Sequence, residues 1–144
     1  MMSRAIELAK QAMARGEVPV GAVITGPDGV IIAEAHNRIE ELKDPTAHAE
    51  MLAIKLATEA LGSERLIDCD LYVSLEPCTM CAGAMVHARV SRLVFAAREP
   101  RAGVVCSTCA LLDEPWYNHV VTWQEGVMAE ESSRLLRAFF RARR

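Results

Sequence analysis

The sequence predicts a layered α/β domain in which helices cover a partly parallel sheet. Three observations support this prediction. Short runs rich in β-branched and apolar residues alternate with longer segments in which apolar residues recur at helical spacing. Glycine and proline separate these segments, and no repeat or linker interrupts them. The length of 144 residues suits one domain with a buried core, so we expect residues 1–144 to form a single domain.

The first half of the chain contains two helical patterns around a hairpin. The predicted elements are a helix over 3–16, strands over 18–25 and 30–35, an irregular loop over 36–46 and a helix over 47–61. The helices follow from apolar residues spaced three or four apart, with Gly16 and Gly62 as stop signals. Gly26-Pro27-Asp28-Gly29 is typical of a turn and makes the two strands a hairpin.

The second half repeats the alternation of strands and helices. The predicted elements are a strand over 71–75, a helix from Pro77 to about Ala88, a strand over 93–97, a loop over 98–119, a strand over 120–123 and a helix over 128–143. The loop lacks a clear period and contains two prolines, although a short helix around 110–112 is compatible with its sequence. The last helix would turn Leu135, Leu136, Phe139 and Phe140 toward the core.

Two short motifs indicate the chemistry. They are His48-Ala49-Glu50 and Pro77-Cys78-Thr79-Met80-Cys81. Together they read His-x-Glu followed by Pro-Cys-x-x-Cys, which is typical of zinc-dependent nucleobase deaminases. His48, Cys78 and Cys81 would supply three zinc ligands and leave a fourth position for water. We therefore expect one catalytic zinc ion.

Glu50 is the residue that we expect to move protons. It would take a proton from the attacking water and pass it to a ring nitrogen and then to the departing ammonia. A lone His-x-Glu is more often a buried histidine beside a solvated glutamate, and a lone Cys-x-x-Cys is first a structural zinc or redox pair. The two motifs in this order, with Pro77 directly before the first cysteine, favour the catalytic site.

The spacing also predicts how the motifs are presented. Cys78 and Cys81 fall on one face of a helix that starts near Pro77, where the helix dipole favours thiolates. Threonine is favoured at the N-cap position of a helix, so a helix capped by Thr46 would place His48 in its first turn. Residues i and i+2 of a helix do not face the same way, so Glu50 reaches the metal only if the helix presents its end. The small Ala49 makes this approach sterically possible.

A second Cys-x-x-Cys, at Cys106 and Cys109, leaves an alternative open. With Cys78 and Cys81 it could form a closed structural zinc site, which would abolish catalysis. The gap between the pairs is long for such a site, and His48 would remain unexplained. We interpret the second pair as loop or helix residues and Cys69 as buried and inert.

Composition excludes several classes of protein. The chain is 51% hydrophobic and 24% charged, as in an ordinary globular protein. Its apolar runs are too short for a bilayer, its N-terminal residues lack the apolar core of a signal peptide, and its five cysteines are an odd number. We therefore expect a cytoplasmic protein with no membrane association and no disulfide framework.

The charge distribution leaves nucleic acid open as a partner. The net charge of −3 argues against it, but five arginines crowd the C-terminus. They are Arg134, Arg137, Arg141, Arg143 and Arg144. Taken alone, such arginines more often complement a helix dipole and stay solvated.

Five segments of the chain match a known family pattern. They are Gly16–Val23 (Gly-Glu-Val-Pro-Val-Gly-Ala-Val), His36-Asn37-Arg38, Asp44–Met51 (Asp-Pro-Thr-Ala-His-Ala-Glu-Met), Leu75–Ala84 (Leu-Glu-Pro-Cys-Thr-Met-Cys-Ala-Gly-Ala) and Phe139–Arg144 (Phe-Phe-Arg-Ala-Arg-Arg). On these segments the chain resembles the bacterial tRNA-specific adenosine deaminases of the cytidine and deoxycytidylate deaminase superfamily, from about residue 3 to the end. The zinc motifs are shared by the whole superfamily, whereas the first and last of these segments discriminate between substrates.

The resemblance implies a fold, a reaction and site residues. It implies a three-layer α/β/α cytidine-deaminase-like fold with a mixed central sheet, and a homodimer with one zinc per subunit. It implies deamination of adenosine to inosine at the wobble position of a tRNA anticodon stem-loop, on a flipped-out base. The substrate contacts expected from the resemblance or from position are Asn37, Val18, Pro19, Val20, Ala49, Leu75, Glu99 and His119, and the expected RNA contacts are Arg141, Arg143 and Arg144.

One segment departs from the family pattern. Ala97-Arg98-Glu99-Pro100-Arg101-Ala102-Gly103 stands where the family commonly has Ala-Arg-Asp-x-Lys-x-Gly, so Glu99 lengthens an acid expected near the nucleotide. Residues 104–109 are also unlike the usual run of small residues. Guanine deaminases and other deaminases of free bases or nucleosides, such as cytosine, share the His-Asn and zinc motifs. A small-molecule deaminase is therefore the alternative function, and a non-enzymatic zinc-stabilised binding module is the third.

Overall fold

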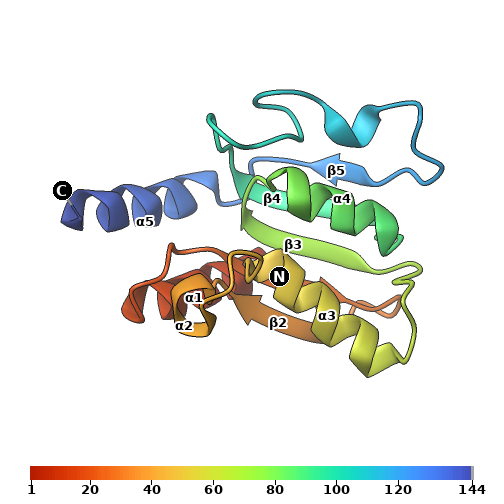
Figure 1. Ribbon diagram of the computed structural model, residues 1–144, viewed down its shortest axis with the longest axis horizontal. Helices are drawn as coiled ribbons and strands as arrows, with labels where there is room; N and C mark the ends of the chain where they lie inside the picture. Colours follow the sequence, from red (N-terminus) through yellow and green to blue (C-terminus); the bar gives the residue numbers. More distant parts are fainter. Residues whose placement is uncertain (144) are drawn as a thin grey trace.

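The computed structural model describes residues 1–143 and contains one five-stranded sheet between two layers of helices (Figure 1). The helices are α1 (Met2–Ala14), α2 (Ile39–Leu42), α3 (Ala49–Leu61), α4 (Thr79–His87) and α5 (Ala129–Ala142), with a 3-10 turn at Leu111–Asp113. The strands are β1 (Gly21–Thr25), β2 (Ile31–His36), β3 (Asp70–Leu75), β4 (Arg92–Ala97) and β5 (Thr122–Gln124).

The sheet is mixed, with strand order β2-β1-β3-β4-β5. β1 pairs antiparallel with both β2 and β3, whereas β3, β4 and β5 run parallel. Because β3 and β4 are parallel, their carboxyl ends meet at one edge of the sheet, where the chain leaves each strand. The three-layer α/β/α fold with a mixed central sheet is thereby confirmed.

Each face of the sheet has its own apolar core. Ile24 and its neighbours pack under α3 and α4, which lie in front of the sheet in Figure 1. Val23 points the other way and packs under α1, which shares that face with α5. Consecutive strand residues face opposite sides, so the apolar runs of β1, β3 and β4 fill both cores. None of the described helices is long and apolar enough to cross a membrane.

The chain between β2 and α3 differs from the prediction. It was expected to be an irregular loop, but it contains the single turn α2. The carboxylate of Glu17, which is buried, accepts hydrogen bonds from the amides of Glu40 and Glu41 at 3.2 and 2.9 Å. A carboxylate at this end of a helix satisfies amides that have no partner within the helix. The residue responsible lies more than twenty positions away, so local sequence gave no sign of it.

Two strand boundaries also differ. β1 begins at Gly21 and not at Val18, because Pro19 has no amide to donate and Val20 N–H bonds back to the Val18 carbonyl at 2.9 Å. β5 covers Thr122–Gln124, two residues later than the predicted start. The short helix considered near residue 110 is the 3-10 turn at Leu111–Asp113.

Candidate active site

The two zinc motifs meet at the starts of two helices. His48 occupies the N-cap position of α3 and Cys78 that of α4, so Cys81 lies in the first turn of α4. β3 delivers the second motif: Glu76 N–H bonds to the Ala97 carbonyl at 2.8 Å where β3 and β4 end, and Pro77 follows. Both helices therefore present their N-terminal ends to the same point, as the i, i+2 spacing of His48 and Glu50 requires.

The donor atoms of His48, Cys78 and Cys81 fit a zinc ion. All three lie within 4.8 Å of one another, and His48 Nδ1 is 3.6 Å from each sulfur. With a Zn–S bond of about 2.3 Å and a Zn–N bond of about 2.0–2.1 Å, tetrahedral ligands lie about 3.6 Å apart. One nitrogen and two sulfurs are also a ligand set that zinc prefers.

Electrostatics favour the thiolate, the ligand form, at Cys78 but not at Cys81. A hydrogen bond from the Cys81 thiol lowers the pKa of Cys78 to about 4; burial opposes this effect and His48 supports it. The Cys78 thiolate and burial in turn raise the pKa of Cys81. One negative charge thus discourages a second, and a divalent cation between the two sulfurs would stabilise both thiolates.

Glu50 is in place to exchange protons. It is the second residue of α3, it is only 4% exposed, and it lines the same pocket as His48 and Cys78. Burial raises its pKa to about 7, because little water is available to solvate the charged form. A carboxyl group with such a pKa changes protonation near neutral pH, as a proton carrier must.

Asn37, and not Thr46, caps the helix that carries His48. Its side-chain oxygen accepts a hydrogen bond from Ala49 N–H at 2.8 Å, and the side chain is buried. The prediction of Thr46 as N-cap was wrong, because the Thr46 hydroxyl and amide both bond to Asp44, at 2.7 and 2.8 Å. Asn37 therefore fixes the start of α3 from the end of β2.

A pocket of about 210 Å³ opens beside the donor atoms. It is lined by Val18, Val20, Asn37, Ile39, His48, Glu50, Leu75, Glu76, Cys78, Glu99 and Ala102. The pocket thus brings together five of the residues predicted as substrate contacts, two of the three predicted ligands and Glu50. Sequence reasoning missed Ile39, Glu76 and Ala102. An acid at the end of a strand, directly before Pro-Cys, was a usable signal for Glu76.

Three predicted substrate contacts do not line this pocket. Pro19 and Ala49 are buried, and Ala49 takes part through its backbone amide alone. His119 lies elsewhere: its Nε2 is 2.8 Å from the carbonyl of Val90, which precedes β4. The pocket lies beyond the opposite end of that strand, so the placement of His119 near the substrate was wrong. Its position in the sequence after the metal motifs did not reveal which end of the sheet the loop would reach.

The two acids at the pocket edge have their own partners. The Glu99 carboxylate accepts hydrogen bonds from the amides of Arg101, at 3.2 Å, and Ala102, so it shapes its own turn. The Glu76 carboxylate accepts bonds from the segment 99–107, which is the start of the long loop after β4. Burial alone would raise the pKa of Glu76, but bonds from Cys106 and Ser107 lower it.

The second cysteine pair does not join the metal site. Cys106 Sγ lies 3.9 Å from Glu125 Oε2, and Cys109 Sγ lies 3.7 Å from the Val104 carbonyl. Among residues 1–143, the three-ligand group of His48, Cys78 and Cys81 is the one that could hold a metal. The four-cysteine alternative is thereby excluded. Cys69 is buried, as expected.

The C-terminal arginines are not equivalent. Arg143 donates to the Gly16 carbonyl at 2.6 Å, and its guanidinium lies 4.2 Å from the centre of the Phe139 ring, so it ties α5 to the end of α1. Arg141 is exposed and lines a hollow between α5 and residues 99–101. Arg144, also predicted to contact RNA, lies outside the described residues.

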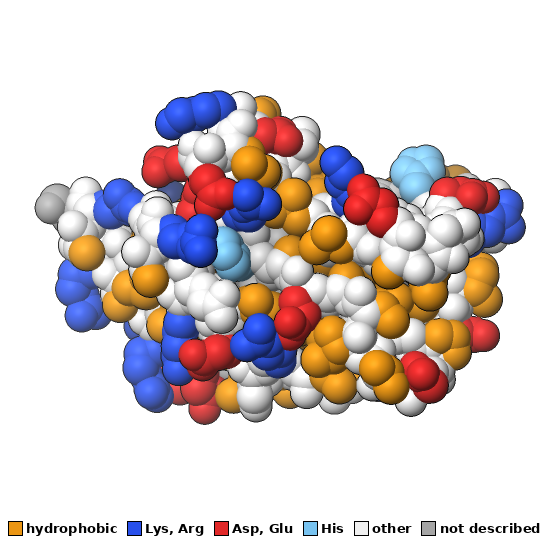
Figure 2. Space-filling model, turned by 90° about the horizontal axis from the view of Figure 1, so that it is seen from below, with side chains coloured by type: hydrophobic (Ala, Val, Ile, Leu, Met, Phe, Trp, Pro, Cys, Tyr) orange, Lys and Arg blue, Asp and Glu red, His pale blue; other side chains and the backbone are white. Residues whose placement is uncertain are grey.

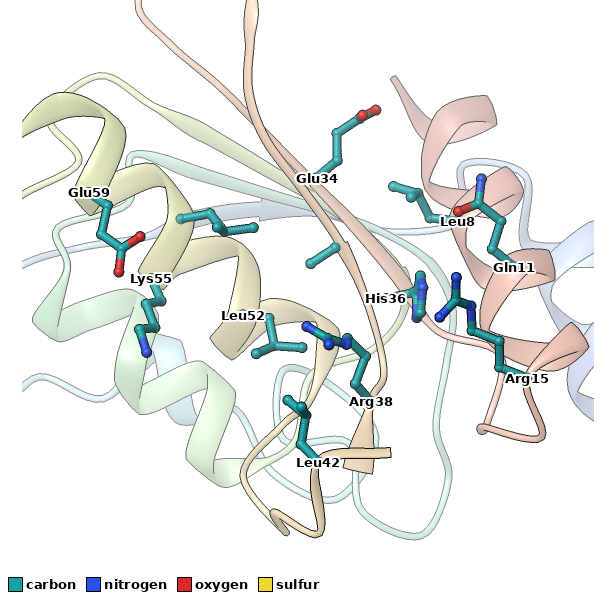
Figure 3. A pocket seen from close by; sticks show the side chains of 12 residues that line it. Leu8, Gln11, Arg15, Glu34, His36, Arg38, Leu42, Leu52, Lys55 and Glu59 are labelled. Atoms are coloured by element: carbon teal, nitrogen blue, oxygen red, sulfur yellow. The ribbon is translucent and has the colours of Figure 1, made fainter. Parts of the chain in front are cut away.

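A larger hollow, of about 710 Å³, lies across β2 between α1 and α3 (Figure 3). Figure 3 shows Arg15 on one side of the strand and Lys55 on the other, with Arg38 near the base. Both arginines pair with Glu41, at 3.3 Å for Arg15. The hollow contains none of the three donor residues. Chemistry, and not volume, therefore identifies the smaller pocket as the site.

Comparisons with known proteins agree with this site. Residues 1–97 match the family model for the cytidine and deoxycytidylate deaminase zinc-binding region. The chain is 52% identical over 137 residues to a tRNA-specific adenosine deaminase of Aquifex aeolicus (strain VF5), covering 95% of this chain and 89% of that protein.

Two solved structures are also similar. One comes from studies of A-to-I editing by tRNA:A34 deaminases at the wobble position of transfer RNA; it has a TM-score of 0.90 and 46% identity, and covers 94% of this chain and 97% of that chain. The other, a guanine deaminase from Nitrosomonas europaea, has a TM-score of 0.81 and 28% identity, and covers 96% of this chain and 81% of that chain. This chain belongs to the cytidine and deoxycytidylate deaminase family and, within it, to the tRNA-specific adenosine deaminases.

Proposed function

We propose that this protein deaminates adenosine to inosine at the wobble position of a tRNA anticodon. The observation that carries the reaction is that the donor atoms of His48, Cys78 and Cys81 lie within 4.8 Å of one another, while the buried Glu50 lines the same small pocket as His48 and Cys78. The similarity to a tRNA-specific adenosine deaminase over nearly the full length of both chains supports the substrate.

The metal ligands and Glu50 would have different roles in the reaction. His48, Cys78 and Cys81 would hold one zinc ion, which acidifies water and so supplies a nucleophile near neutral pH. Glu50 would accept the proton that the attacking water releases. It would deliver this proton to the ring nitrogen. It would then take the second proton from the new hydroxyl on the ring carbon and deliver it to the exocyclic nitrogen, so that ammonia leaves and not an amide anion. Adenosine and water become inosine and ammonia.

The walls of the pocket suit a base taken out of its stack. Val18, Val20, Ile39 and Leu75 offer apolar surface to the ring, and Asn37 and Glu99 stand at its edges. A base in an RNA helix could not reach Glu50, which is buried. An unpaired loop base can be extruded at a cost of about a few kcal/mol, which favours an anticodon loop over a duplex.

Replacement of Glu50 tests the reaction. In Glu50→Ala we expect zinc to remain at one per chain while the turnover rate with an anticodon stem-loop falls by at least about 10²–10⁴-fold. Glu59→Ala is the matched control, because Glu59 is an exposed acid on the same helix. Near-normal turnover by a zinc-replete Glu50→Ala protein would defeat the assignment.

A groove leads from the pocket along α5. A hollow of about 620 Å³ shares Val18, Leu75 and Glu99 with the pocket and continues past Arg101 to Phe140. Basic side chains gather at the end of the molecule that α5 forms, whereas acidic and basic side chains are mixed on the rest of the visible face (Figure 2). We infer that the flanking nucleotides lie here, with phosphates near Arg141 and bases against Phe140.

Salt dependence tests this RNA path. If Arg141 contacts a phosphate, Arg141→Ala should weaken binding of the stem-loop and reduce the slope of log K against log salt by about 1. Arg65→Ala removes the same charge from an exposed position between α3 and β3 and should leave the slope unchanged. Equal affinities of Arg141→Ala and the unaltered protein at every salt concentration would exclude the contact.

A small-molecule deaminase is the second candidate. The similarity to a guanine deaminase, at 28% identity, supports it, because a pocket of this size would also accept a free base. A screen with zinc-replete protein separates the candidates. Deamination of the stem-loop alone supports the proposal, whereas deamination of guanine, cytosine or free adenosine without the stem-loop supports the second candidate.

We infer further that residues 1–144 act as one domain, in a cytoplasmic homodimer. A tRNA substrate supports the location, and Leu56 and Leu61, which α3 leaves exposed, offer apolar surface that a second subunit could cover. Light scattering that returned the mass of one chain at micromolar concentration would contradict the dimer.

A further inference from the structure

We propose that Glu76 is a positioning residue for the deamination, whose carboxylate holds the segment 99–107 where it forms one wall of the base pocket. The inference rests on the proposed function for the identity of the substrate. It concerns a residue to which the mechanism above gives no proton transfer.

The carboxylate of Glu76 gathers five donors from this segment. Oε1 accepts from Glu99 N–H at 3.0 Å and from the Ser107 hydroxyl. Oε2 accepts from the amides of Val105, Cys106 and Ser107 at 3.0, 2.9 and 3.0 Å. The residue is only 3% exposed, so water cannot readily replace these bonds. Both ends of the segment therefore depend on one side chain.

Glu76 is itself fixed by the sheet. Its amide bonds to the Ala97 carbonyl at the shared end of β3 and β4, at 2.8 Å. The segment lies close against it: a Cβ added to Gly103 would lie 2.5 Å from Glu76 Oε1 and 2.6 Å from the Glu99 carbonyl oxygen. Val104 N–H also bonds to the Pro77 carbonyl at 3.1 Å. The carboxylate thus connects a rigid strand end to a loop.

The loop needs this connection because it has little structure of its own. Between β4 and β5 the described chain contains no regular element except one 3-10 turn. The buried amide of Val105 and the half-buried amides of Cys106 and Ser107 would otherwise lose their acceptor, which is costly. The same segment supplies Glu99 and Ala102 to the pocket that His48, Cys78 and Glu50 also line. The position of the wall relative to Glu50 therefore follows from Glu76.

Glu76→Gln separates the two ends of the segment. A glutamine has one acceptor oxygen, and turning it toward Val105, Cys106 and Ser107 keeps those three bonds. Its NH₂ group then faces Glu99 N–H, which is also a donor, while the Ser107 hydroxyl can rotate to accept. The substitution should release the segment at Glu99, the end that lines the pocket, and leave its other end in place.

The test uses zinc-replete protein, with hydrogen exchange and steady-state kinetics on an anticodon stem-loop. For Glu76→Gln we expect one zinc per chain, faster exchange of amides 99–103 with unchanged exchange in α1 and α3, and kcat/KM about tenfold to a hundredfold lower, mainly through KM. Glu34→Gln is the control. Glu34 lies on β2 and pairs with Arg4 of α1, so its replacement should leave KM and the exchange of amides 99–103 unchanged.

A structural role alone would lower the folded fraction and thus kcat, with KM unchanged. Unchanged KM together with unchanged exchange at 99–103, or loss of zinc from Glu76→Gln, would overturn the proposal. If this variant does not fold, Ser107→Ala removes one bond to the same carboxylate, and local exchange and KM should rise about twofold to fivefold; no rise would overturn the proposal. If the unaltered protein does not deaminate the stem-loop, the proposed function fails. The role of Glu76 is then tested by hydrogen exchange at 99–103 and by KM for the base that the protein does deaminate.

Discussion

Gly21 is the point where α1 comes closest to the sheet, and its substitution by alanine should destabilise the protein strongly. A Cβ added there would lie 2.7 Å from both Ala9 N and Leu8 Cβ, and closer still to the carbonyl oxygen of Ala5. Two of these three atoms belong to the backbone of α1, so no side chain can rotate away. The helix itself would have to move.

The size of the effect follows from these distances. Carbon atoms in contact prefer about 3.5–4.0 Å, so α1 must retreat by about 1 Å. The retreat loosens the layer in which Ala5, Ile6 and Ala9 are fully or almost fully buried. Overpacking of a core costs about 1–3 kcal/mol, and backbone contacts place Gly21→Ala at the upper end. For a chain of 144 residues, about 3 kcal/mol lowers Tm by about 6–12 °C.

Thermal unfolding followed by circular dichroism measures this shift. Gly83→Ala is the matched control: Gly83 lies within α4, and an added Cβ would have no heavy atom within 4 Å. Because alanine is the better helix former, we expect this variant to be more stable by about 0.5–1 kcal/mol. A Tm for Gly21→Ala equal to that of the unaltered protein would refute the close packing of α1 on β1.

Three further predictions concern the site and the last helix. Removal of zinc by a chelator should abolish turnover and lower Tm, because zinc at a free concentration of 100 times Kd adds about 2.7 kcal/mol to the free energy of unfolding. A Tm unaffected by chelation and by added zinc would contradict this. Ser132→Ala should cost about 1–3 kcal/mol in urea unfolding, because the buried Ser132 hydroxyl donates to the Ser74 carbonyl; a change below about 0.5 kcal/mol would mean that this bond does not contribute. Gly103→Ala should press on Glu76 and raise KM at least about tenfold, which kinetics that match those of the unaltered protein would disprove.

Local patterns were enough for most of the fold. Helical spacing predicted α1, α3 and α5, and β-branched runs predicted the strands, because each signal lies within the element that it describes. α2 was not predicted, since its amides are satisfied by Glu17 from a distant part of the chain. The cap of α3 was wrongly assigned to Thr46. The true cap acceptor, the Asn37 side chain, also lies outside the local sequence, twelve residues before Ala49.

The part of the site that short, contiguous motifs encode could be predicted from the sequence. His48, Glu50, Cys78 and Cys81 were found from spacing alone, and the structure brings them together at two helix starts. His119 was misplaced, because a loop without periodicity does not reveal which edge of the sheet it follows. Glu76 was missed as a pocket residue, because four of its five hydrogen-bond donors are backbone amides of a loop, which no side-chain pattern marks.

The arrangement around Glu76 separates two properties of the protein that need not change together. The ligands and the proton carrier lie at the starts of α3 and α4, whereas part of the pocket wall is a loop that is held to one carboxylate by hydrogen bonds from four backbone amides and one hydroxyl. A backbone N–H can donate such a hydrogen bond whatever the side chain, except in proline. The side chains of residues 99–107 can therefore change, and with them the base or RNA that is admitted, while the metal ligands and Glu50 stay the same.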